Sequence, residues 1–409
     1  MQVYFHYRGG NNQIPTFTSS LPIIIFLFII FLFPPISNSQ GQADSRIAGN
    51  IIDAETREPI AYANIFISNS SIGTASDKNG YFELRNLSNG KYEIIASVIG
   101  YEILKANVRI YNNNRRNFRF EMYKNPIAME EVVVKGKAPR KRRRQLAQFR
   151  RNFLGSSQNG KKSYIKNEEV VRFEEKNGML LAYAYEPLEI INDGLGYRIF
   201  YILEEYIQTS QEIKFTGYDH FIEQTATTYH DSVDWPENRK NTYLGSQRHF
   251  LTTICENYEM TNGDTTTRPI KKDWGDVVNY RTKVTYVDSS HIENEGFFVI
   301  QMKYLQGPNK FRFSNLVNTN WFLSEAENEN EMYLKFDIFL QVEYDNEFYP
   351  FNRLAGESRR RSWIQLTCDS TVVDKRGRYF DKYAIQTRGL WSNERVADML
   401  PFDYKLKKD

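Results

Sequence analysis

Short runs of alternating apolar and polar residues fill the stretch from residue 46 to residue 122, and turn-forming residues separate the runs. In residues 91–98, Tyr92, Ile94 and Ala96 take every second position, so their side chains share one face of a strand. Short strands joined by tight turns predict a small β-sandwich of about seven strands. The expected strands include residues 46–53, 62–67, 81–84, 91–98, 103–111 and 116–122.

Two turns in this stretch can be placed from their residue types. Asp77-Lys78-Asn79-Gly80 predicts a hairpin turn, because asparagine and glycine accept the positive φ that a tight turn requires. Asn89-Gly90 predicts a second reversal of the chain by the same reasoning.

The stretch resembles the carboxypeptidase regulatory-like module, a transthyretin-like β-sandwich that is common in the cell envelope of Bacteroidota. The resemblance implies a fold and an envelope setting, since such modules serve mostly as spacers or docking surfaces. It rests on Ile47-Ala48-Gly49-Asn50-Ile51-Ile52-Asp53, Pro59-Ile60-Ala61-Tyr62-Ala63-Asn64-Ile65, Gly73-Thr74, Asp77-Lys78-Asn79-Gly80-Tyr81-Phe82 and Val98-Ile99-Gly100-Tyr101.

Residues 123–153 are predicted to link this module to the rest of the chain. The run Glu130-Glu131-Val132-Val133-Val134 resembles the segment after the same module in TonB-dependent transporters, but the residues that follow are too few for a plug and a large barrel. We expect a strand that pairs with the edge of one of the two domains. A short helix should follow, because Leu146, Phe149 and Phe153 recur at helical spacing.

A basic run opens that helix. Like charges in a row usually form a solvated face, which is the first interpretation. The second is a peripheral contact with anionic lipid or polysaccharide at an envelope surface. The run consists of Arg140, Lys141, Arg142, Arg143 and Arg144.

Residues 154–409 are predicted to form a larger β-rich domain with at least one packed helix, which makes the whole protein mainly β. Asp234 and Glu237 match a capping box and Pro236 suits a first helical turn, so one helix is expected from about Pro236 to Tyr258. The expected strands are 169–174, 180–185, 197–206, 213–217, 220–223, 280–287, 297–305, 333–344, 363–367 and 383–387, with a turn at Asp193-Gly194.

The composition and the first residues indicate where the protein is located. The formal charge of +3 over 409 residues gives no support to a nucleic-acid partner. Arg8, the apolar run from Leu21 to Phe33 and the small residues before Gln40 predict a signal peptide over residues 1–39, with a retained membrane anchor as the alternative. N-terminal sequencing of the mature protein would contradict cleavage near Ser39 if it found residues before Ser37.

The expected mature chain also resembles a group of exported Bacteroidota proteins that are usually described only by their regulatory-like module. This second resemblance implies an exported protein and no particular chemistry. It rests on Phe153-Leu154-Gly155, Glu186-Pro187-Leu188-Glu189-Ile190-Ile191-Asn192, Leu195-Gly196-Tyr197, Tyr243-Leu244-Gly245-Ser246-Gln247-Arg248-His249-Phe250 and Arg395-Val396-Ala397-Asp398-Met399-Leu400-Pro401.

The name of the module invites a search for a zinc site, and His220 and Glu223 have the His-x-x-Glu spacing of zinc carboxypeptidases. A third ligand is needed, and His291 follows too soon in the chain to match that family. In a strand His220 and Glu223 would point to opposite faces. We therefore expect no metal site and no cofactor.

Two other candidates have an ordinary structural interpretation beside the functional one. Ser246 and His249 could share a helical face as a nucleophile and base, but no orienting carboxylate can be assigned, so helix packing is favoured. Aromatic residues could stack on sugar rings, although in a strand-rich domain they more often belong to the core. The aromatic candidates are Trp321, Phe322, Trp363 and Trp391.

The cysteines are Cys255 and Cys368, which we expect to be buried and unpaired. With no catalytic set assigned, the sequence predicts a non-enzymatic envelope protein that binds another protein or a glycan. The alternative is an envelope hydrolase, acting on peptides or glycans, with an unrecognised site in residues 154–409. A convergent cluster of titratable groups in a deep pocket would favour that enzyme.

Overall fold

The computed structural model describes residues 45–110, 116–125, 140–256, 285–288, 296–304, 311–313, 322–328, 330–337, 339–345 and 361–406. The predicted signal peptide, the Glu-Val-Val-Val run, His291 and Trp321 lie outside these residues. None of the helices in the described part combines the length and the apolar composition needed to cross a bilayer.

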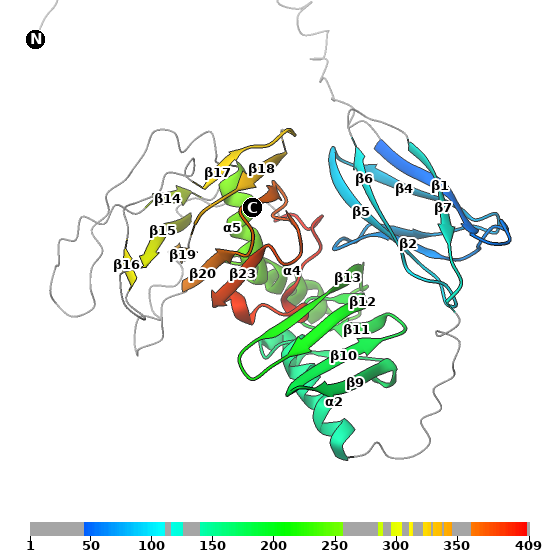
Figure 1. Ribbon diagram of the computed structural model, residues 1–409, viewed down its shortest axis with the longest axis horizontal. Helices are drawn as coiled ribbons and strands as arrows, with labels where there is room; N and C mark the ends of the chain where they lie inside the picture. Colours follow the sequence, from blue (N-terminus) through cyan, green and yellow to red (C-terminus); the bar gives the residue numbers. More distant parts are fainter. Residues whose placement is uncertain are drawn as a thin grey trace, which may run out of the picture. The chain divides into compact units, whose positions relative to one another are not determined.

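The first part of the chain is a β-sandwich, as the alternating pattern predicts (Figure 1). Buried side chains from both of its sheets form one core, among them Ile47, Ile65 and Ile94. One sheet has the order β4-β1-β7 and consists of β1 (Ser45–Asp53), β4 (Tyr81–Leu87) and β7 (Arg116–Met122). The other has the order β3-β2-β5-β6 and consists of β2 (Asn64–Ile67), β3 (Gly73–Ala75), β5 (Gly90–Ser97) and β6 (Leu104–Ile110).

The hairpin turn at Gly80 shows why the sequence determines this fold locally. The N–H of Gly80 donates to the carbonyl oxygen of Asp77 at 3.0 Å, and Gly80 has φ +72°. A Cβ at Gly80 would lie 2.4 Å from the carbonyl oxygen of Ile51, so only glycine fits this turn without strain.

A second sheet system follows the helix α2 (Arg140–Phe153), whose Phe149 and Phe153 are fully buried against Tyr206 and Tyr201. The sheet has the order β8-β11-β12-β10-β9, and β13 pairs with β12. Its strands are β8 (Ser163–Ile165), β9 (Val171–Lys176), β10 (Met179–Ala184), β11 (Leu188–Asn192), β12 (Tyr197–Gln208) and β13 (Ile213–Glu223). The short helix α3 (Gln158–Lys161) precedes β8, and the 3₁₀ turn η2 (Glu168–Val170) lies between β8 and β9.

Two further sheets complete the described part of residues 154–409. One has the order β14-β15-β19-β20-β23, with β16 paired to β15, and the other has the order β17-β18-β21-β22. The strands are β14 (Thr285–Asp288), β15 (Gly296–Tyr304), β16 (Phe311–Phe313), β17 (Leu323–Glu325), β18 (Glu331–Leu334), β19 (Phe339–Asp345), β20 (Arg361–Leu366), β21 (Thr371–Asp374), β22 (Tyr379–Phe380) and β23 (Ile385–Gly389). The turns η6 (Trp391–Asn393) and η7 (Val396–Asp398) follow.

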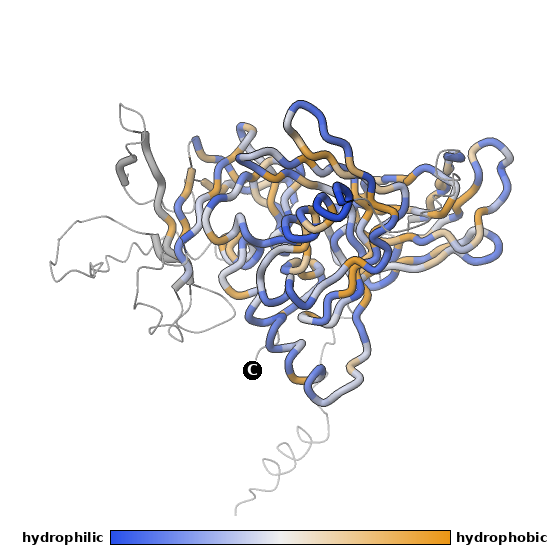
Figure 2. The backbone as a smooth tube through the Cα atoms, turned by 90° about the horizontal axis from the view of Figure 1, so that it is seen from below, coloured by the Kyte–Doolittle hydropathy of each residue, from blue (hydrophilic) through white to orange (hydrophobic). Residues whose placement is uncertain are grey.

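The protein is mainly β with a few packed helices, as predicted, but several elements differ from the expectation. The two strands expected at 213–217 and 220–223 are the single strand β13, and the one expected at 333–344 is β18 and β19. Figure 2 shows apolar and polar residues alternating at short intervals along the backbone, which is the pattern that half-buried strands require.

The single helix predicted from Pro236 to Tyr258 is wrong. The chain forms α4 (Tyr229–Tyr243) and α5 (Gln247–Glu256), with Gly245 between them at φ +75°. The capping box of α4 is made by Thr228 and Asp231, so Pro236 lies inside the helix and not in its first turn.

Candidate functional site

The β-sandwich uses both faces of its β3-β2-β5-β6 sheet. Phe66 and Ile95 alternate with core residues, so their side chains point away from the sandwich core. They are nevertheless 3% and 0% exposed, because they pack with Ile202 of β12 and Tyr218 of β13. The larger domain therefore covers the outer face of the module's sheet.

Main-chain hydrogen bonds join the two parts at the loop that follows β2. The N–H of Asn69 donates to the carbonyl oxygen of Asp219 at 2.8 Å, and the N–H of Phe221 donates to that of Ser70 at 3.0 Å. The loop thus pairs with β13 through a parallel bridge between Ser70 and His220. The N–H of Phe402 also donates to the carbonyl oxygen of Asn69 at 2.8 Å.

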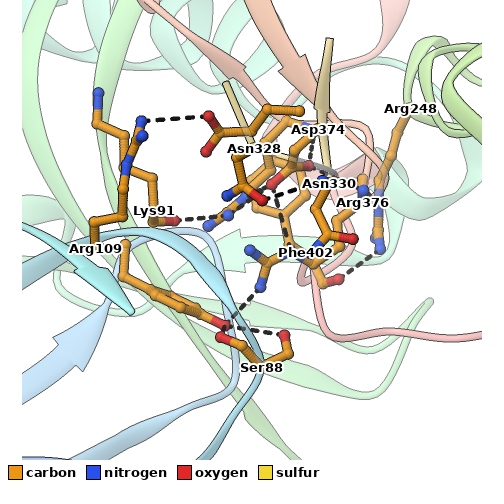
Figure 3. A network of polar contacts seen from close by, with 12 residues as sticks. Ser88, Lys91, Arg109, Arg248, Asn328, Asn330, Asp374, Arg376 and Phe402 are labelled. Atoms are coloured by element: carbon orange, nitrogen blue, oxygen red, sulfur yellow. Dashed lines mark hydrogen bonds and ion pairs between the residues drawn. The ribbon is translucent and has the colours of Figure 1, made fainter. Parts of the chain in front are cut away.

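A polar network joins the module and the larger domain at the first residues of β5 (Figure 3). Arg376 donates to the hydroxyl of Tyr92 at 2.9 Å, and Arg378 donates to the carbonyl oxygen of Lys91 at 2.7 Å. Asp374 forms an ion pair with Arg378 at 2.6 Å. Burial alone would raise the pKa of Asp374, but the two guanidinium groups outweigh it and hold the pKa below its usual range.

Arg248 of α5 fixes the C-terminal segment against this network. Its guanidinium is surrounded by carbonyl oxygens, an arrangement that satisfies a buried cation without a carboxylate. The carbonyl acceptors are those of Arg376 at 3.1 Å, Leu400 at 3.4 Å, Pro401 at 2.7 Å, Phe402 at 2.9 Å and Tyr404 at 3.0 Å.

A cleft of about 1590 Å³ lies where these elements meet. The module contributes Ser68, Asn69, Lys91, Glu93 and Asn107 to its wall, and the larger domain contributes parts of β12, β13, α5, β22 and β23. A cleft of this size, with polar groups from both parts, has room for a ligand larger than a single small metabolite.

Three residues of the cleft wall each have a buried polar atom with no hydrogen-bond partner among the described residues. These atoms are the Oγ atom of Ser68, a residue 4% exposed, the Oδ1 atom of Asp219, a residue 2% exposed, and the Nε2 atom of Gln247. A buried polar atom without a partner costs about 1–3 kcal/mol, so folded proteins rarely keep one without a reason. The Ser68 hydroxyl can donate or accept a hydrogen bond, and the Asp219 Oδ1 atom accepts one when the carboxylate is ionised.

Carboxyl groups in the wall of the cleft have unusual acidities. Burial raises the pKa of Asp219 to about 7, although its own amide, Lys382 and the amide of Asn69 oppose the shift. Burial likewise raises the pKa of Glu394 to about 8 and raises that of Asp398. The side chains of Ser157 and Asn159 donate to Asp398 at 2.7 Å and 3.0 Å, which gives Asp398 a clear structural role.

The structure does not bring His220 and Glu223 together at a metal site. His220 stacks on Phe66 with ring centroids 5.0 Å apart, and Gly73 leaves room for it, since a Cβ there would lie 2.5 Å from Nε2. Glu223 instead forms an ion pair with Arg239 of α4. Among the described residues there is no group of three side chains that could hold a metal ion.

Ser246 and His249 belong to the helix start and not to a catalytic pair. The N–H of His249 donates to the Oγ atom of Ser246 at 3.1 Å, and the Nδ1 atom of His249 accepts from the N–H of Gly245 at 3.1 Å. His249 is 0% exposed. Both side chains therefore stabilise the turn between α4 and α5.

Phe322 and Trp391 belong to the core, as the favoured interpretation of the aromatic candidates predicts, and are 1% and 5% exposed. Trp391 lines the inner wall of the cleft, and its ring N–H donates to the carbonyl oxygen of Gly245 at 2.7 Å. Trp363 is half-buried and donates to the side chain of Gln341 at 3.1 Å.

Among the residues that the structure describes, some members of the basic run have a polar partner and others have none. Arg142 donates to the carbonyl oxygen of Val171 at 2.9 Å, and Lys141 forms an ion pair with Glu175 at 2.9 Å. The description as a solvated face is therefore wrong for Arg142, which is half-buried, while Arg140, Arg143 and Arg144 are exposed.

Both cysteines are unpaired, as predicted, but only Cys255 is buried, and Cys368 is exposed. The expectation of two buried thiols is thus wrong for Cys368. It lies between β20 and β21, and its Sγ atom contacts the carbonyl oxygen of Ser370 at 3.3 Å.

Sequence reasoning missed Ser68 and Asp219, because both follow the strand pattern and neither belongs to a known motif. The one available signal was an acidic residue inside the apolar strand Tyr218-Asp219-His220-Phe221. A charged residue in a strand that alternates between two buried faces calls for a partner or a function.

Residues 47–134 match the family model of the CarboxypepD_reg-like domain. A comparison with curated proteins finds no match. The similar solved structures include a cohesin–X-dockerin complex from Acetivibrio cellulolyticus, with 22% identity over 20% of this chain and 58% of that chain and a TM-score of 0.17. The major pilin subunit BcpA of Bacillus cereus has 20% identity over 20% of this chain and 31% of that chain, with a TM-score of 0.19.

A putative carbohydrate binding protein from Bacteroides uniformis is 9% identical over 44% of this chain and 98% of that chain, with a TM-score of 0.17. The chain spans 58%, 42% and 30% of the length of three of the matched structures, less than two thirds in each case. Structural likeness at these scores carries no functional argument.

Proposed function

We propose that this chain is a non-enzymatic binding or scaffolding protein of the cell envelope, exported to the periplasm or associated with the outer membrane. The match of residues 47–134 to a regulatory-like domain and the signal peptide expected over residues 1–39 support this address. The module is not a free spacer in this proposal. It docks on the larger domain and supplies one wall of the cleft.

The cleft is the observation that carries the proposal. It combines a large recess with the unpartnered Ser68 Oγ and Asp219 Oδ1 atoms, one from each part of the chain. A ligand that hydrogen-bonds to both atoms would remove two desolvation costs and at the same time reinforce the docking. The partner is an envelope protein or glycan that enters the cleft.

The test is calorimetric titration of the chain from residue 40 onward with defined polysaccharides and with an unfolded model polypeptide. Thr387→Trp narrows the cleft, because Thr387 lies in its wall on β23, and should abolish binding. Ser324→Trp is the matched control, since Ser324 is exposed on β17 and outside the cleft. Equal binding by both variants, or no binding by the unmodified chain, would contradict the proposal.

An envelope hydrolase is the second candidate, and the carboxyl groups of the cleft favour it. Asp219 and Glu394 have pKa values raised to about 7 and about 8, which is the range a general acid needs near neutral pH. The expected result for this candidate is slow release of reducing ends or new amines from a bound chain. Asp219→Asn should then abolish release.

A further inference from the structure

Three exposed arginines lie on one side of α2. Arg140, Arg144 and Arg151 are 4 and 7 residues apart, so at 100° per residue they fall within about 40° of one another around the helix. They follow the axis for about 16 Å, at 1.5 Å per residue. All three are exposed, and none forms an ion pair with a carboxylate of the described residues.

Two neighbouring cations of the same helix do have carboxylate partners. Lys141 pairs with Glu175 at 2.9 Å and Arg150 pairs with Glu168 at 3.1 Å. Lys141 and Arg150 lie on opposite sides of α2, nine residues apart at 100° per residue, so carboxylates neutralise a cation on each side of the stripe. The stripe, defined here as Arg140, Arg144 and Arg151, has no carboxylate partner among the described residues.

The stripe leads to the cleft, because Arg151 lines its wall together with Arg395. Burial raises the pKa of Tyr206, while a hydrogen bond from Asn152 and the charges of Arg395 and Arg151 act in the opposite direction. Arg395 also has no carboxylate partner among the residues that the structure describes.

Local packing holds Arg395 in this position. A Cβ at Gly155 would lie 3.0 Å from the Cβ of Arg395, so the stem of Arg395 rests on the glycine that follows α2. The guanidinium lies 5.9 Å from the ring centroid of Phe215, which lines the cleft. A cation fixed on an aromatic ring at the inner end of the stripe is a ready contact for an anion.

We propose that the stripe and Arg395 form a track that guides an anionic polysaccharide, bearing carboxylate or sulfate groups, along α2 and into the cleft. Guanidinium forks pair well with planar carboxylates and with sulfate oxygens. Contacts spaced along a helix and ending inside a recess fit a chain, whereas a flat bilayer would touch the exposed stripe and not Arg395. This inference rests on the proposed binding function and names the class of ligand.

Polygalacturonate, dextran sulfate and neutral dextran serve as probes in titrations of the full chain at low and moderate salt. Arg140→Glu with Arg144→Glu should weaken binding of the two anionic chains by about tenfold, since reversal removes two attractions and adds two repulsions. Arg395→Gln should weaken it further. Lys78→Glu with Lys335→Glu is the control with the same charge change, at exposed sites away from the stripe and the cleft.

The inference is overturned if the control weakens binding as much as the reversal of the stripe, or if neutral dextran binds as tightly as the anionic chains. Binding to phosphatidylglycerol vesicles without binding to either anionic polysaccharide would also overturn it, in favour of a membrane contact. Thr387→Trp could abolish binding of a neutral or peptide ligand while reversal of the stripe has no effect. That result would support the proposed binding function and contradict the track. If none of the probes binds, both fail.

Discussion

Asp219 is a residue whose position makes little sense for stability alone. It is 2% exposed, it lies in a strand between the two parts of the chain, and its Oδ1 atom has no partner among the described residues. Its pKa is raised from 3.8 to about 7, so the folded protein prefers the neutral acid. Asp219 lowers the stability of the folded protein at neutral pH. The simplest reason to retain such a residue is that a ligand binds to it.

This leads to a prediction on pH. A raised folded-state pKa gives a stabilising contribution that is complete below the unfolded value and is lost as the pH rises to the folded value, here from about 4 to about 7. The unmodified chain should therefore lose melting temperature over this window relative to Asp219→Asn, whose amide does not titrate. Thermal unfolding at pH 4, 6 and 8 measures the difference, and parallel curves for the two proteins would contradict it.

The elements show where local sequence determines structure and where it does not. Six of the seven strands described in the module follow from alternation and turn residues, and the short strand β3 was not expected. The break between α4 and α5 was missed because Leu244, Leu251 and Ile254 keep helical spacing across Gly245. The deciding contact is distant: Tyr344 of β19 lies where the Cβ of a residue at 245 would be.

Gly245→Ala tests this explanation. An added Cβ would lie 2.7 Å from the ring of Tyr344, and the position has φ +75°, which costs other residues about 1–2 kcal/mol. We expect the free energy of unfolding to fall by about 2–4 kcal/mol in urea titration, from backbone strain and the clash together. If the variant is more stable and more helical by circular dichroism, the continuous helix that the sequence suggests is the preferred form after all.

At the scale of the whole molecule, the cleft could not be predicted because it depends on docking. Ser68 and Asp219 are far apart in the chain, and they meet in one wall only because Phe66 and Ile95 pack on Ile202 and Tyr218. Side-chain alternation marks Phe66 as facing away from the module core, but it does not say what covers the residue. The family resemblance implied the module but not this contact.

Docking of this kind predicts cooperative unfolding of the two parts. Phe66→Ser removes a side chain that lies outside the module core and inside the docking contact, at a cost of about 3 kcal/mol. Calorimetry should then resolve two transitions where the unmodified chain shows one. Ile99→Ser is the control, because Ile99 is 80% exposed on the same module. Two transitions in the unmodified chain would mean that docking does not couple the parts, and a single transition in Phe66→Ser would mean that the coupling does not depend on Phe66.

The C-terminal segment held by Arg248 has a consequence for the order in which the protein assembles. Phe402 and Asp403 form hydrogen bonds with the loop residues Asn69 and Ser71, more than 300 positions earlier in the chain. The module can acquire its own core as soon as its strands exist, since those contacts are local. The docked state also needs residues that lie more than 300 positions further along the chain. The cleft should therefore close after the module has formed its own core.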